Sequence, residues 1–215
     1  PAPRVIPLDP RLTPQENAEN YFRGFKKGKR GVEHVARRRE ETLQQRQYLE
    51  ELELSLEEAQ SAAELEAVRQ ELRAAGVLRE PPPSHSRAPA SPASMVRRAV
   101  SPGGFVVLWG RHSRSNDHLS RELTAADDLW FHAHGQPGSH VVLKRGAHRG
   151  EIPKADLLYA AAVAAGYSRG KDDAKVEVMV TEGKWVRRPK GARPGLVTVE
   201  QYRTVMVAPM RVEEQ

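Results

Sequence analysis

Between Pro14 and Pro81 the sequence contains no proline, and this gap constrains the fold more than any other feature. Proline interrupts helices, and most residues in the gap are good helix formers. Thr13, Pro14 and Glu16 form a helix start, because threonine caps the first turn, proline suits the first helical position and the glutamate completes a capping box. The pattern predicts one long helix from there to about Leu56, of ~45 residues and roughly 65 Å.

A second, shorter helix is expected between Ser61 and Gly76. Ser61 and Glu64 form another capping box, and apolar residues follow at helical spacing. Gly76 suits the end of this helix, because glycine readily adopts the left-handed conformation found there.

The long helix has few apolar residues. They follow only a heptad-like rhythm, which Lys29 and Arg39 interrupt, so the helix is a weak candidate for a self-sufficient coiled coil. We interpret it as one half of a helical hairpin whose partner is supplied elsewhere. Four of its apolar residues are therefore expected to pair with another chain, in a possible homodimer: Phe22, Phe25, Val32 and Leu43.

Charge is divided along this helical region. Residues 23–39 hold eight basic residues and one acid, whereas residues 40–80 hold eleven acids and four arginines. The chain has a net charge of +6, which favours polyanion partners, nucleic acid before membrane surface, although a basic soluble protein without such a partner is the alternative. The candidate RNA contacts of the basic half are Lys26, Lys27, Lys29, Arg30, Arg37 and Arg38.

Several classes of protein do not fit this sequence. The absence of cysteine excludes disulfide scaffolds and thiolate sites, and no apolar run approaches the ~20 residues of a membrane span. No signal peptide precedes the first residues, so we expect a cytoplasmic protein. Because the chain starts at Pro1 rather than methionine, we expect it to be part of something longer.

The composition predicts three regions: a helical coiled-coil arm (1–80), a linker rich in proline and serine (81–94) and a second domain (95–212). In the second domain, strands on both sides of a single alanine-rich helix predict an α+β fold. The strands are expected at 105–109, 129–133, 140–143, 175–180, 196–199 and 204–207, and the helix at 155–165 after Pro153.

The segment from Asp128 to His134 carries the most chemical information. As a strand it places Leu129, Phe131 and Ala133 on a core face, and Asp128, Trp130, His132 and His134 on the opposite face. That second face has an aromatic ring and imidazoles on which RNA bases stack and hydrogen-bond. Burial of Trp130 and His132 under a helix is the alternative.

Histidine is concentrated between His112 and His140, but the spacing matches no metal-binding motif. The sequence has no nucleophile elbow, no phosphate-binding loop and no dinucleotide-binding glycine pattern. We therefore expect no catalytic residue, cofactor or metal, with a metal-dependent enzyme as an alternative.

Residues 184–193 carry five positive charges and no acid. Such cations neutralise phosphates, and Trp185 among them can stack on a base. A solvated basic loop is the alternative. The candidate RNA-binding residues of this segment are Lys184, Arg187, Arg188, Lys190 and Arg193.

Taken in order, these segments resemble the NFACT family and in particular its bacterial RqcH-type branch, members of which have also been described as fibronectin-binding proteins. Upstream motifs resemble the descending half of that family's coiled-coil arm. Downstream motifs resemble its NFACT-R domain: Gly110-Arg111, Asn116-Asp117-x-Leu119, Asp128-x-Trp130-x-His132-Ala133 and Gly138-Ser139-His140-Val141-Val142.

The resemblance implies a ribosome-associated quality-control factor. Such proteins bind the large ribosomal subunit with stalled peptidyl-tRNA and recruit alanyl-tRNA for template-free C-terminal alanine tailing, while the ribosome forms the peptide bonds. The residues that determine tRNA specificity lie in family domains outside this sequence. A fibronectin-binding surface adhesin is the alternative. Further RNA-binding candidates are Arg111, Asn116, Asp117, Trp130, His132, Ser139 and His140.

Overall fold

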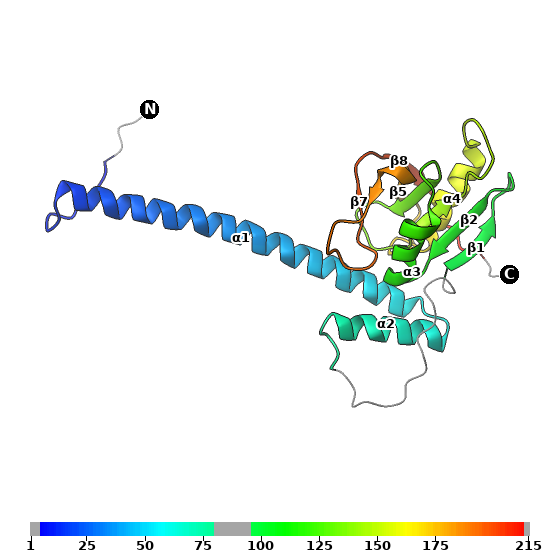
Figure 1. Ribbon diagram of the computed structural model, residues 1–215, viewed down its shortest axis with the longest axis horizontal. Coiled ribbons are helices and arrows are strands. Elements are labelled where there is room, and N and C mark those ends of the chain that lie inside the picture. Colours follow the sequence, from blue (N-terminus) through cyan, green and yellow to red (C-terminus); the bar gives the residue numbers. More distant parts are fainter. Residues whose placement is uncertain (1–4, 80–95, 213–215) are drawn as a thin grey trace. The chain divides into compact units, whose positions relative to one another are not determined.

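The computed structural model describes residues 5–79 and 96–212 (Figure 1). The chain divides into two compact units, Pro1–Arg46 and Gln47–Gln215, which are described separately below as the N-terminal and C-terminal units. The expected linker, residues 81–94, lies outside the described residues, and the three predicted regions stay a prediction. Within the described residues, no helix combines the length and the apolar character needed to cross a membrane.

The N-terminal unit contains the first part of helix α1, which spans Pro14–Glu57. The predicted capping box is confirmed: the Thr13 N–H donates to Glu16 Oε2 at 2.7 Å, and the Glu16 N–H donates to Thr13 Oγ1 at 3.3 Å. Asn17 is buried and fixes the preceding turn, because its amide oxygen accepts from the Asp9 N–H at 2.8 Å and its Nδ2 donates to the Asp9 carbonyl at 3.1 Å.

The C-terminal unit begins with the last turns of α1 and continues into helix α2, Ala62–Ala74. The predicted Ser61 cap is confirmed, since Ser61 Oγ accepts from the Glu64 N–H at 3.2 Å. Glu64 does not complete a capping box, because its carboxylate accepts from the Gln60 N–H instead, at 2.8 Å. Gly76 follows the helix with a φ of 72°, a conformation that glycine adopts without strain.

A six-stranded antiparallel sheet forms the centre of the C-terminal unit and confirms the α+β prediction. The strand order is β1-β2-β4-β3-β5-β8. In β3, Trp130 lies opposite Val142 of β4 and Thr181 of β5. The strands are β1 Val96–Val100, β2 Val106–Gly110, β3 Leu129–Ala133, β4 Val141–Leu143, β5 Val176–Glu182 and β8 Arg203–Val207.

Helix α4, Lys154–Gly166, packs on one face of this sheet and encloses the larger core. Phe131 and Ala133 point into that core, as the alternation along the strand predicts. The alanine side chains of α4 allow close packing on the strands. Gly166 is required where the chain returns, because a Cβ atom there would lie 2.0 Å from the Met210 carbonyl oxygen.

The other face of the sheet carries several short elements. Of these, only the segment 198–199 was predicted from the sequence, as part of the strand expected at 196–199. Helix α3 starts at a reciprocal cap, in which the His112 ring accepts from the Ser115 N–H. A single π-helical turn, η2, follows α3 directly. The elements are α3 Ser113–His118, η2 Leu119–Leu123, the 3-10 helix η3 Gly183–Trp185 and a two-stranded ribbon of β6 Val186–Arg187 and β7 Thr198–Val199.

Candidate nucleic-acid interface

The face of β3 that contains Trp130 forms a second core and is not an open surface. Trp130 is 0% exposed and packs with Leu119 and Val142, which are equally buried. Half-buried Val186 and Val197 pack against this cluster. The prediction that Trp130 stacks on RNA bases is therefore wrong. Residues of η2 and of the β6–β7 region cover the indole, and its burial was the alternative that the sequence left open.

His132 and His140 lie side by side beneath the same cover. Their ring centroids are 5.3 Å apart, and His132 Nδ1 lies 3.3 Å from the Ser139 carbonyl oxygen. Burial lowers the pKa of His132, and burial together with the neighbouring His132 holds the pKa of His140 well below its ordinary value. Because a neutral imidazole carries no charge, these rings are poor ligands for phosphate and instead organise the surrounding loops.

Asn116 connects α3 to the turn that contains Ser139. Its amide oxygen accepts from the His140 N–H at 3.1 Å, and its Nδ2 reaches the Gly138 carbonyl at 3.5 Å. The position is tightly constrained, because a Cβ at Gly110 would lie 2.5 Å from Asn116 Oδ1. Asn116 and Ser139 are both buried, at 8% and 5% exposed, so this part of the motif holds the structure together and presents little surface.

Asp117 anchors the basic segment 184–195. One carboxylate oxygen accepts from Arg188 at 3.2 Å and from Arg121 at 3.4 Å, and the other accepts from the Gly195 N–H at 3.4 Å. As an acid, Asp117 repels phosphate. Its contacts hold Arg121 and Arg188 in place, and a role of Asp117 in RNA binding stays a prediction.

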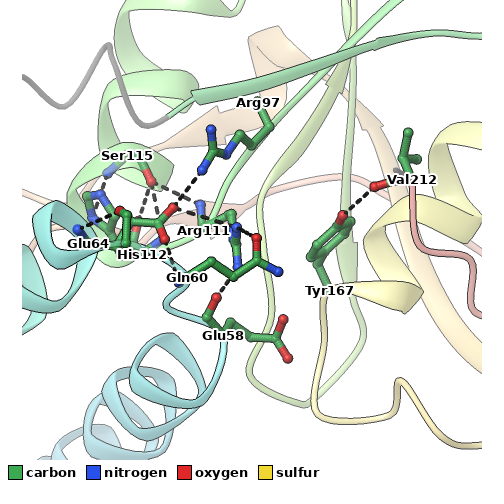
Figure 2. Close-up of polar contacts among 10 residues, drawn as sticks. Glu58, Gln60, Glu64, Arg97, Arg111, His112, Ser115, Tyr167 and Val212 are labelled. Carbon is green, nitrogen blue, oxygen red and sulfur yellow. Dashed lines mark hydrogen bonds and ion pairs between the residues drawn. The ribbon is translucent and has the colours of Figure 1, made fainter. Parts of the chain in front are cut away.

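Arg111 is 6% exposed and lies against the turn between α1 and α2 (Figure 2). It donates to the Glu58 carbonyl oxygen and to Gln60 Oε1, the latter at 3.1 Å, and lies 3.6 Å from the Glu64 carboxylate. Arg97 reaches the same carboxylate at 3.0 Å. The prediction that Arg111 contacts RNA is corrected, because the acidic turn occupies the guanidinium and covers it.

Sequence reasoning missed an acidic docking face, formed by Glu58, Glu64 and Glu71, which binds basic side chains of the sheet domain. Glu58 accepts from Lys171 at 2.8 Å and from Arg211 at 2.6 Å, and these bonds lower its pKa against the opposing effect of burial. Glu71 lies 3.6 Å from the His112 ring. The excess of acids in residues 40–80 could have predicted this face, because a run of acids can bind a basic surface of the same chain.

The cations of residues 184–193 lie mostly at the surface. Lys184 forms an ion pair with Glu182 and lies over the Trp185 ring, and Arg187 pairs with Glu200 at 2.7 Å. Lys190 is exposed. Arg193 lies 4.7 Å from the centroid of the Tyr48 ring. The structure therefore brings four of the five predicted loop cations to an accessible surface, with Arg188 half-buried at its base.

The predicted cations of the N-terminal unit are exposed along α1. Arg37 and Arg38 both reach Glu41, at 3.9 and 3.2 Å, which reduces their availability for phosphate. The remaining four predicted contacts of this helix have no carboxylate within ion-pair distance among the residues that the structure describes: Lys26, Lys27, Lys29 and Arg30. Across residues 5–79 and 96–212, no three histidine or acidic side chains converge as they would around a metal ion.

Two family models account for most of the chain. The NFACT N-terminal and middle domains match residues 2–89, and the NFACT protein RNA binding domain matches residues 95–200. These matches fall on the helical region and on most of the sheet domain, respectively.

Individual relatives agree with these models. The chain is 32% identical over 205 residues to the Rqc2 homolog RqcH of Bacillus subtilis (strain 168), and 34% identical over 204 residues to that of Streptococcus suis (strain 05ZYH33). These alignments cover 95% of this chain but only 35% and 36% of the relatives, so the chain spans about a third of their length.

A solved structure extends the agreement to three dimensions. The C-terminal part of the fibronectin/fibrinogen-binding protein from Streptococcus suis superimposes with a TM-score of 0.77 at 32% identity. The match covers 93% of this chain and 77% of that structure. The chain therefore belongs to the NFACT family, and residues 95–200 correspond to the RNA-binding domain of that family.

Proposed function

We propose that this chain is the RNA-binding part of a cytoplasmic, ribosome-associated quality-control factor. In this proposal it binds the large ribosomal subunit carrying a stalled peptidyl-tRNA and helps to recruit alanyl-tRNA for template-free C-terminal alanine tailing. It contributes binding and positioning and is not itself an enzyme, because peptide-bond formation is left to the ribosome. The proposal is supported by the family membership and by the RqcH relatives.

The observation that carries the proposal is the exposed basic segment 184–193 in the domain that matches the RNA-binding model. Asp117 binds Arg188 and the Gly195 N–H, so the segment that carries the cations is held in place at its base. Ordered cations at a surface favour phosphate binding, because they neutralise the backbone and release its counterions.

The test is binding to purified large ribosomal subunits over a series of salt concentrations. We would remove three exposed loop charges together, as Lys184→Ala, Arg187→Ala and Lys190→Ala, and leave half-buried Arg188 intact. If all three contact phosphate, the slope of log K against log [salt] should become shallower by about 2, at roughly 0.7 per contact for single-stranded RNA.

A matched control removes three exposed cations elsewhere in the C-terminal unit: Arg149→Ala, Lys154→Ala and Arg203→Ala. This variant has the same net charge as the loop variant, so it should lower affinity only slightly and keep the original slope. Equal losses in both variants, or equal binding to any polyanion, would contradict a specific docking surface on the loop.

The structural relative supplies a second candidate, because its description names fibronectin and fibrinogen binding. We expect a basic protein to bind such partners mainly by charge, so binding should disappear at physiological salt. Saturable fibronectin binding that survives at that salt concentration would favour the adhesin function instead.

A further inference from the structure

We propose that the C-terminal unit contains a pocket for one unpaired nucleotide of RNA, between η2 and the β6–β7 ribbon. This inference rests on the proposed function and specifies the kind of RNA that the domain prefers. A base inside a duplex cannot enter a hollow, so the pocket selects a nucleotide that is bulged, looped out or single-stranded.

The hollow has the size of a ligand site. It measures about 450 Å³, within the roughly 300–1,000 Å³ of pockets that hold small ligands. It is formed by η2 and the residues after it on one side, and by the start of the basic segment on the other. The two sides approach each other closely at Gly183, where a Cβ atom would lie 2.2 Å from the Ala125 carbonyl oxygen.

Apolar side chains line part of the hollow. Val186 belongs to the ribbon and Val197 directly precedes it, and both are half-buried because their other sides pack on the second core. Ala126 adds a small exposed methyl group. Such a surface suits the flat apolar face of a base. It does not distinguish one base from another, because burial of apolar area has no directional requirement.

The hydroxyl of Ser120 gives the hollow a fixed polar group. It accepts from Trp130 Nε1 at 3.1 Å and lies 2.8 Å from His140 Nδ1. A hydroxyl offers one donor and two acceptor positions, so one position remains for a ligand whichever tautomer His140 adopts. The two buried rings orient this hydroxyl, and a base edge or a ribose hydroxyl can complete its bonds.

The rim of the hollow is cationic. Arg121, Lys184 and Arg188 line it, and its lining includes no acid. Asp117 lies behind the rim and orients two of these side chains, and the buried Arg188 Nε has no hydrogen-bond partner within the described residues. A base on the valines therefore places its phosphate beside guanidinium groups that are already positioned.

The backbone next to the pocket is unusual. Ser120 and Arg121 lie in the π-helical turn η2, and the Thr124 hydroxyl donates to the Leu119 carbonyl at 2.7 Å as the turn ends. Such turns are rare and occur frequently at functional sites. Here the turn brings both half-buried Ser120 and exposed Arg121 to the lining of the hollow.

The test compares two RNA hairpins that differ by one bulged nucleotide, measured by fluorescence anisotropy with the whole chain at one salt concentration. We expect the bulged hairpin to bind at least about tenfold more tightly. Ala126→Trp should remove this preference and leave the affinity for the fully paired hairpin unchanged, because it fills the hollow without changing charge. The matched control, Ala125→Trp, adds the same ring at an exposed neighbour that does not line the hollow and should keep the preference.

A second measurement does not depend on any variant. With 2-aminopurine as the bulged base, its emission should change on binding, while the same base placed in the stem should not respond. Equal affinities for the two hairpins, or a preference that persists in Ala126→Trp, would overturn the pocket while leaving general RNA binding intact. Failure of both hairpins to bind would instead count against the proposed function.

Discussion

Replacing Glu51 by glutamine should stabilise the C-terminal unit at neutral and alkaline pH. Glu51 lines a small cavity of about 20 Å³ between the end of α1 and the sheet domain, roughly the space of one water molecule. Burial raises its pKa to about 7, against a hydrogen bond from Gln47 that lowers it, and Glu71 and Glu50 raise it further. The carboxylate form is therefore unfavourable in the folded state.

The sign and size of the effect follow from linkage. A folded-state pKa above the unfolded value of 4.5 gives stability that is fully present below pH 4.5 and is lost as the pH rises through 7. The difference corresponds to roughly 3 kcal/mol above pH 7. The amide carries no charge, so Glu51→Gln should match the original chain near pH 4.5 and exceed it by up to about 3 kcal/mol at pH 8.

The assay is urea unfolding of both chains at several pH values, followed by circular dichroism. Glu40→Gln is the matched control, because it removes one exposed carboxylate from the same helix and should change stability by less than about 0.5 kcal/mol. If Glu51→Gln shows no gain in stability at pH 8, or the same gain at every pH, the assignment of a half-buried, destabilised carboxylate is refuted.

Three further outcomes are expected. Arg111→Ala should lower the free energy of unfolding by about 3–5 kcal/mol in the same urea assay, because it leaves the buried Glu64 carboxylate without this partner; a loss below about 1 kcal/mol would contradict it. Nuclear magnetic resonance should show His132 and His140 neutral at pH 6.5, because burial lowers both pKa values, so this pair favours unfolding as the pH falls below 6.5; ordinary titration near 6.5 would be the opposing result. Light scattering at tens of micromolar should show dimers that Phe25→Glu disrupts, since Phe25 is 66% exposed on α1; a strictly monomeric chain would rule the pairing out.

The local features of the fold were predictable because their causes are local. Thr13 and Glu16 bond to each other three residues apart, so the start of α1 is encoded in four letters of sequence. Strand 129–133 was predicted with the observed bounds, because its alternation depends only on which face is apolar. Gly76 ends α2 for an equally local reason, its positive φ.

The candidate site depends on distant partners, which a reading of neighbouring residues does not reveal. Alternation placed Trp130 opposite the main core, but its cover comes from Leu119 and Val197, whose positions follow from tertiary folding. Helix α3 is short and polar, and its start depends on an unusual histidine cap. Arg111 follows Gly110 at the end of β2, and only the folded chain shows the acidic turn against it.

The buried ion pair between Arg111 and Glu64 should respond to added salt differently from the RNA-binding surface. Their side chains are 3% and 4% exposed, so dissolved ions screen the attraction between them weakly. Four of the five cations of residues 184–193 face solvent, where added salt competes directly with phosphate. As salt is raised, RNA should therefore dissociate well before the acidic turn leaves the sheet domain, and a salt wash should return the protein folded and ready to bind again.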